Sequence, residues 1–168
     1  MSFPFLKPVC LAIICWQAAS GSAPAQGTPR RTLLALSKAD HTLAIVDPGN
    51  LQVLARIPVG SDPHEVVASS DGRTAFVSIY GGGSLHELDI LDLDAQKPKQ
   101  QFDTRPLLGP HGLDFAEDEL WFTAEGSKAV GRFDPATGRV DWVMGTGQDR
   151  THMIYVASGG KRVYTTNV

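Results

Sequence analysis

One short pattern occurs three times in this chain and constrains its fold more than any other feature. A histidine opens a β-capable segment, a turn residue follows seven positions later, and a second apolar segment comes after the turn. The three copies begin at His64, His111 and His152, which are 47 and 41 residues apart. The chain is therefore built from repeats of one short-stranded unit.

A second set of turns keeps the same spacing. Asp47-Pro48 and Asp134-Pro135 are 87 residues apart, about two repeats, and a glycine follows each Asp after 13 positions. A recurring unit of about 40–45 residues made of short strands is typical of a β-propeller blade. The sequence therefore predicts an all-β fold, a β-propeller of four-stranded blades.

The 143 residues from position 26 onward hold about three and a third such blades. We expect the first unit to lack its inner strand and the last to contain only an inner hairpin. Because propellers close with about four to eight blades, we expect either part of a longer, seven-bladed propeller or a truncated gene product. The open blade faces of such an arc invite self-association. The predicted blade units are 32–60, 63–108, 110–148 and 151–168. Aromatic residues at matching strand positions are predicted to form the core: Phe76, Phe115, Trp121, Phe122 and Tyr164.

The first 25 residues differ from the rest in composition. Lys7 precedes an apolar run of eight residues, Val9–Trp16, and small residues follow it. This layout predicts a signal peptide over 1–25, a linker over 26–31 and a periplasmic or secreted protein. The apolar run is too short to span a bilayer comfortably, so no transmembrane span is expected after cleavage. A lipid anchor at Cys15 and an uncleaved anchor are the alternatives.

Composition excludes several classes of function. The net charge is −3 and no lysine or arginine run is present, so the sequence carries no nucleic-acid signal. Cys10 and Cys15 both fall inside the predicted signal peptide, which leaves the mature chain without a disulfide, a thiolate metal site or a cysteine nucleophile. The nucleophile-elbow pattern Gly-x-Ser-x-Gly is also absent.

The three repeated histidines are the best candidates for a functional site. The inner strand of a blade lines the central channel, so His64, His111 and His152 are expected to converge at the mouth of the channel. Converging imidazoles can bind a small molecule, hold a divalent metal or transfer protons near neutral pH. The alternative is structural, with each histidine tying its strand to a loop. Asp62 and Glu125 are secondary candidates, and a loop-capping role is favoured for Glu125.

Two repeat families resemble parts of this chain. Thr74–Ser78 and Val163–Asn167, each after a turn, resemble the YVTN β-propeller repeat of surface and periplasmic proteins, a group that includes lactonase-like propellers. The third unit resembles the repeats of virginiamycin B lyase (streptogramin lyase) at Pro110-His111-Gly112, Leu120–Thr123 and Gly131–Gly138. The resemblance implies the propeller fold. It implies no catalytic residue here, because the magnesium-linked residues of those lyases lie in later blades.

Two functions are consistent with this fold. The first is a non-catalytic scaffold that binds a small molecule or a partner protein at the channel mouth. The second is a metal-dependent lyase or lactonase acting on a cyclic ester, with Mg²⁺ or Ca²⁺ polarising an ester oxygen and a histidine moving the proton. The scaffold is favoured, because the lyase residues would come from blades that this chain does not contain.

Overall fold

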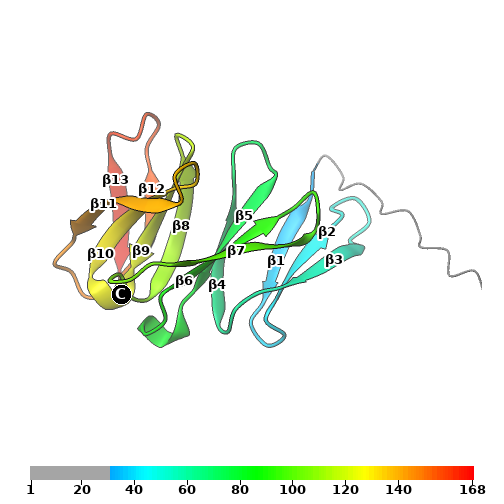
Figure 1. Ribbon diagram of the computed structural model, residues 1–168, viewed down its shortest axis with the longest axis horizontal. Helices are drawn as coiled ribbons and strands as arrows, with labels where there is room; N and C mark the ends of the chain where they lie inside the picture. Colours follow the sequence, from blue (N-terminus) through cyan, green and yellow to red (C-terminus); the bar gives the residue numbers. More distant parts are fainter. Residues whose placement is uncertain (1–30) are drawn as a thin grey trace, which may run out of the picture.

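The computed structural model describes residues 31–168, which form thirteen β-strands in four antiparallel sheets. In Figure 1 the first sheet lies at one end of the molecule, the second in the middle, and the third and last together at the other end. The predicted signal peptide and residues 26–30 of the predicted linker lie outside the described residues. No helix within residues 31–168 is long and apolar enough to cross a membrane.

The strands follow one another through each sheet in chain order. The first sheet contains β1 (Leu33–Ser37), β2 (Thr42–Val46) and β3 (Val53–Pro58). The second contains β4 (Pro63–Ala68), β5 (Thr74–Ile79), β6 (Glu87–Asp92) and β7 (Lys97–Asp103). The third contains β8 (Pro110–Ala116), β9 (Glu119–Ala124), β10 (Ala129–Asp134) and β11 (Arg139–Gly145). The last contains β12 (Thr151–Val156) and β13 (Val163–Asn167). Single 3₁₀ turns follow β5 and β9: η1 (Gly81–Gly83) and η2 (Glu125–Ser127).

Turn residues explain where the strands end. In the β8–β9 hairpin, Ala116 pairs with Glu119, so two residues connect the strands. Both of them, Glu117 and Asp118, have positive φ angles of 54° and 61°. This is the conformation of a type I′ turn, whose twist matches the strands that it joins. In the β4–β5 hairpin, Gly72 adopts the positive φ (71°), which costs glycine little.

Apolar residues between neighbouring sheets form three core clusters. Between the second and third sheets the core is built around Phe76, Phe122 and Phe133, each 1% exposed or less. Burying one such side chain contributes roughly 1.5–3 kcal/mol. The third and last sheets meet through Trp121, Val130, Ile154 and Val156. The first and second sheets meet through Leu43, Ile45, Ile57, Ala75, Val77, Ile79, Leu91 and Leu93. Hydrophobic burial between sheets therefore holds the blades against one another.

Four of the five aromatic residues predicted as core belong to these clusters or pack against them. The prediction for Tyr164 was wrong: its side chain is 52% exposed and stacks on Tyr155, which is 61% exposed, with ring centroids 6.3 Å apart. The reason is that the described residues place no further sheet against the β12–β13 hairpin. We call this uncovered surface of Met153, Tyr155, Tyr164 and Thr166 the open face.

Candidate functional site

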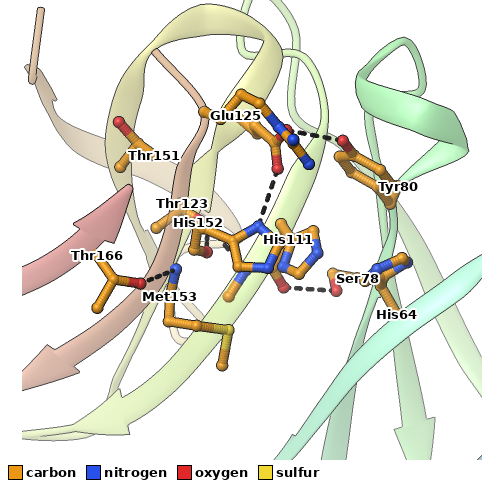
Figure 2. Close-up of polar contacts among 12 residues, drawn as sticks. His64, Ser78, Tyr80, His111, Thr123, Glu125, Thr151, His152, Met153 and Thr166 are labelled. Atoms are coloured by element: carbon orange, nitrogen blue, oxygen red, sulfur yellow. Dashed lines mark hydrogen bonds and ion pairs between the residues drawn. The ribbon is translucent and has the colours of Figure 1, made fainter. Parts of the chain in front are cut away.

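The inner strands of three successive sheets bring the repeated histidines into one row. The ring centroids of His64 and His111 are 4.1 Å apart, and those of His111 and His152 are 3.9 Å apart. His111 lies between the other two, as Figure 2 shows, and is 2% exposed. The side chains of His64 and His152 are 24% and 27% exposed. We refer to these three residues as the histidine row.

Each histidine lies at an interruption of the strand pairing. The pairing register of β4, β8 and β12 shifts across the histidine and the residue after it. Such an irregularity re-aims the side chains that it carries. The N–H of the residue after each histidine is donated instead to a hydroxyl on the second strand of the same sheet. These hydroxyls belong to Ser78, Thr123 and Thr166.

The same hydroxyls connect one sheet to the next. Ser78 Oγ donates to the backbone carbonyl of His111 (2.7 Å), and Thr123 Oγ1 donates to that of His152 (2.6 Å). Both hydroxyl side chains are fully buried. Two of the three histidines therefore have their backbone fixed from the preceding blade. The hydroxyl of Thr166 donates to no group within residues 31–168, because its side chain lies on the open face.

The residue that follows the second strand of a sheet contacts the histidine of the next sheet. Lys38 follows β1, which takes the second-strand place in the incomplete first sheet, and its Nζ is 3.0 Å from His64 Nδ1. Tyr80 follows β5, and its ring centroid is 4.9 Å from that of the middle histidine. Glu125 follows β9, and its Oε2 is 3.1 Å from His152 Nδ1. Sequence reasoning selected Glu125 but missed Lys38 and Tyr80, although their position after the second strand is a readable signal.

Glu125 is the most tightly held acidic group of the site. It is 7% exposed, and its Oε1 accepts hydrogen bonds from Tyr80 Oη and Arg150 Nε, both at 2.9 Å. Burial alone would raise the pKa of this carboxyl, but hydrogen bonds from Arg150, His152 and Tyr80 outweigh it and lower the pKa to about 2. An ionised carboxylate only accepts, so His152 Nδ1 donates to Oε2. Glu125 is thus a central group of the site and not merely a cap on its loop.

His111 has no hydrogen-bond partner for either ring nitrogen within residues 31–168. Burial, followed by the nearby His64 and His152 rings, lowers the pKa of His111 to about 4. The ring is therefore neutral near pH 7, with one nitrogen a donor and the other an acceptor. Buried polar groups are nearly always paired in folded proteins. The unpaired imidazole near the Glu125 carboxylate makes the histidine row a candidate binding site.

Asp62 contacts Lys38 more closely than it contacts the histidine row. Its Oδ1 is 2.7 Å from Lys38 Nζ and 3.9 Å from His64 Nδ1. The hydrogen bond from Lys38 is the main cause that lowers the pKa of Asp62. Burial, followed by the charge of Lys38, lowers the pKa of His64. The Lys38–Asp62 ion pair therefore lies at the His64 end of the row.

One group of side chains within residues 31–168 could hold a metal ion. His111, Glu125 and His152 each offer one ligand atom, and these atoms all lie within 4.8 Å of one another. His64 was part of the predicted ligand set but lies outside this group, and the secondary candidate Glu125 stands in its place. The group spans the third and last sheets, so it forms only when those sheets pack together.

A cavity of about 390 Å³ lies at the opposite end of the blades from the histidine row, among the hairpin turns of the second and third sheets. Phe76, Phe115 and Phe133 lie in its wall, and Asp71 and Lys99 are among its polar residues. The buried unpaired polar atoms found in residues 31–168 include none from its lining. The histidine row is therefore the stronger candidate site.

Known structures identify the architecture, whereas no protein-family model and no curated protein matches the sequence. Similar structures include Kuenenia stuttgartiensis hydrazine synthase, with a TM-score of 0.73 and 15% identity over 81% of this chain and 38% of that chain. U3-55K has a TM-score of 0.68 and 17% identity over 81% of this chain and 42% of that chain. The mitotic checkpoint complex has a TM-score of 0.69 and 14% identity over 82% of this chain and 43% of that chain. The fold is part of a β-propeller. The predicted all-β fold with four-stranded blades is thereby confirmed.

These similarities concern architecture alone. Identities of 14–17% show a shared fold and carry no activity. The chain spans about two fifths of the length of each of these structures. The likeness to YVTN and virginiamycin B lyase repeats is not identified by any of them and stays a prediction.

Proposed function

We propose that this protein is an exported, YVTN- and virginiamycin B lyase-like propeller that binds a small molecule or a partner protein at its channel mouth. The observation that carries the proposal is the unpaired His111 ring, which is 2% exposed yet keeps both nitrogens free within residues 31–168. A ligand that enters the row gains a donor and an acceptor there without displacing a protein hydrogen bond. The predicted signal peptide supports the periplasmic or secreted location.

The charges around the row favour a polar ligand. Lys38 and Arg150 lie at its two ends, paired with Asp62 and Glu125 respectively. The Arg150 side chain is 56% exposed, so its remaining N–H groups face solvent beside the third histidine. A ligand with both acceptor and donor groups complements this arrangement better than an apolar one.

Fragment screening tests this proposal directly. Saturation-transfer NMR of the purified chain against a library of small polar fragments, with EDTA present, is expected to find ligands. Protein-observed spectra should then show that these ligands shift the His111 ring resonances. His111→Phe keeps a ring but removes both nitrogens, and should abolish that binding. His41→Asn is the control, because His41 is exposed, lies outside the row and has a positive φ that asparagine tolerates. If no fragment distinguishes wild type from His111→Phe, the proposal is wrong.

A metal-dependent lyase or lactonase acting on a cyclic ester is the second candidate. The observation that favours it is the group of His111, Glu125 and His152. A divalent metal held there would supply Lewis-acid polarisation of an ester carbonyl, and His64, outside the ligand group, is placed to move a proton beside it. Metal-dependent opening of a cyclic ester by the wild-type chain, lost in His111→Phe and kept in His41→Asn, would favour this candidate over the scaffold.

A further inference from the structure

We infer that His111, Glu125 and His152 form a site for Zn²⁺ rather than for the Mg²⁺ or Ca²⁺ expected from the sequence. The inference rests on the proposed function, since it names a ligand for the same channel mouth. It differs from the sequence prediction in the metal and in the ligand set.

The donor atoms decide the choice of metal. Two of the three ligands are imidazole nitrogens and the third is a carboxylate oxygen. Ca²⁺ and Mg²⁺ take oxygen ligands, six to eight for Ca²⁺ and about six for Mg²⁺. Zn²⁺ takes two histidines and a glutamate readily, and three protein ligands leave its fourth position open for water or a substrate. The site therefore fits a metal of the Zn²⁺ class with one exchangeable position.

The distances are compatible with a shared ion. Two ligands of one tetrahedral Zn²⁺, each about 2.0–2.2 Å from the metal, are roughly 3.3–3.6 Å apart. Glu125 Oε2 and His152 Nδ1 are 3.1 Å apart, and the three ligand atoms all lie within 4.8 Å of one another. Small side-chain rotations bring this set to the spacing of a metal site. His111 contributes a nitrogen that has no protein partner to give up.

Surrounding contacts hold the ligands in place. Tyr80 and Arg150 occupy the other oxygen of Glu125, and leave Oε2 directed at the histidines. Ser78 and Thr123 fix the backbone carbonyls of His111 and His152. Hydrogen bonds of this kind orient metal ligands and commonly change affinity about 10–100-fold. Figure 2 shows Glu125 and His152 next to the His111 ring.

Metal titration of the full chain after EDTA treatment and dialysis tests the inference. Isothermal titration with Zn²⁺ should show one ion bound per chain, and Co²⁺ should give the visible absorption of a tetrahedral site. Separate titrations with Mg²⁺ and Ca²⁺ should show much weaker binding. His111→Phe, Glu125→Gln and His152→Phe should each weaken Zn²⁺ binding by more than about tenfold, because the loss of an outer-shell partner alone commonly costs 10–100-fold and these residues are the ligands themselves. The His152 variant disturbs the core least, because that ring is partly exposed.

Two controls make the result specific. His64→Phe keeps the ring packed against His111 but removes nitrogens from outside the ligand group, so Zn²⁺ affinity should change little. His41→Asn removes an exposed histidine and should likewise leave Zn²⁺ binding intact. No Zn²⁺ binding, preference for Mg²⁺ or Ca²⁺, or Zn²⁺ binding unchanged in folded His152→Phe would each overturn the zinc site. Because the fragment screen contains EDTA, fragment binding without Zn²⁺ binding would overturn the zinc site alone.

Discussion

Glu119 is partly buried, and the effect of its charge on stability can be measured by changing the pH. Its Oε2 is buried without a partner in residues 31–168, and burial, followed by the charges of Asp134 and Asp141, raises the pKa of Glu119. A raised pKa in the folded state means that its stabilising contribution is present below the ordinary value of 4.5 and is lost as the pH rises above it. We expect Glu119→Gln to raise the free energy of unfolding near neutral pH, because the amide carries no charge for burial and the neighbouring carboxylates to oppose.

Urea unfolding at neutral pH and below the ordinary carboxyl pKa checks this prediction. The gain should shrink toward zero in acid, where wild-type Glu119 is itself neutral. Asp118→Asn is the comparison variant, because Asp118 is exposed in the same turn and has a positive φ that asparagine tolerates. Asp118 is the weakest of the charges that raise the pKa of Glu119, so its removal should stabilise the chain less than Glu119→Gln does. An equal gain at both pH values would show that charge is not the cause.

Gly112 sets the distance between two members of the histidine row. A Cβ at this position would lie 2.5 Å from the His152 carbonyl oxygen and 2.8 Å from Met153 Cα, both backbone atoms. Gly112→Ala should therefore push β12 away from β8, lower the free energy of unfolding by about 1–3 kcal/mol and weaken Zn²⁺ binding. Gly145→Ala is the control, because nothing lies within 4 Å of its added Cβ. Thermal melting and the same metal titration would compare the stability and the Zn²⁺ affinity of the two variants. Unchanged Zn²⁺ binding in Gly112→Ala would contradict the predicted link between this glycine and the metal site.

At the residue scale, the sequence revealed which histidines converge but not which partners they meet. The histidines were readable because each precedes a turn by the same distance. Tyr80 could have been found from its place after β5. Arg150 could not, because it reaches Glu125 from the loop before β12, where its own φ is 49°, and a loop conformation of this kind leaves no periodic signal. Such long-range pairings depend on how sheets pack.

At the element scale, the hydroxyl link between blades can be tested within one series. Thr123→Val keeps the shape of the side chain but leaves the Gly112 N–H and the His152 carbonyl without their partner. We expect a loss of about 1–3 kcal/mol, as for buried polar groups left unpaired. Thr166→Val is the matched control, because Thr166 only accepts one N–H and is exposed, so the loss should stay within about 0.5 kcal/mol. Equal losses in urea unfolding would mean that the link between sheets contributes nothing.

The strands themselves were largely predictable, and the interruptions in them were not. The β8–β9 hairpin follows from its two-residue turn at Glu117 and Asp118, which local chemistry specifies. The register shift at each histidine has no local signature in the residue that follows it. That residue is Glu65, Gly112 or Met153, and the three have no chemical property in common. It depends on a hydroxyl from the neighbouring strand, which becomes meaningful only once the strands are paired.

At the scale of the whole molecule, the open face governs how the chain behaves in solution. Tyr155 and Tyr164 are stacked there at 61% and 52% exposure, with Met153 beside them at 37%. In the complete part of the propeller, the equivalent surface of each blade is covered by the next blade. Uncovered aromatic surface of this kind favours association, and a stable contact needs roughly 800 Å² from each partner.

We therefore expect the purified chain to self-associate through the open face. Light scattering behind a sizing column should show a mass that rises with concentration, and the double variant Tyr155→Ser with Tyr164→Ser should return it toward the monomer. Leu51→Asn is the control, because Leu51 is 71% exposed in a turn of the first sheet, away from the open face. A wild-type monomer at every concentration would contradict this prediction and show that these sheets remain in solution without a partner on the open face. A double variant that associates like wild type would place the contact on the uncovered surface of the first sheet instead.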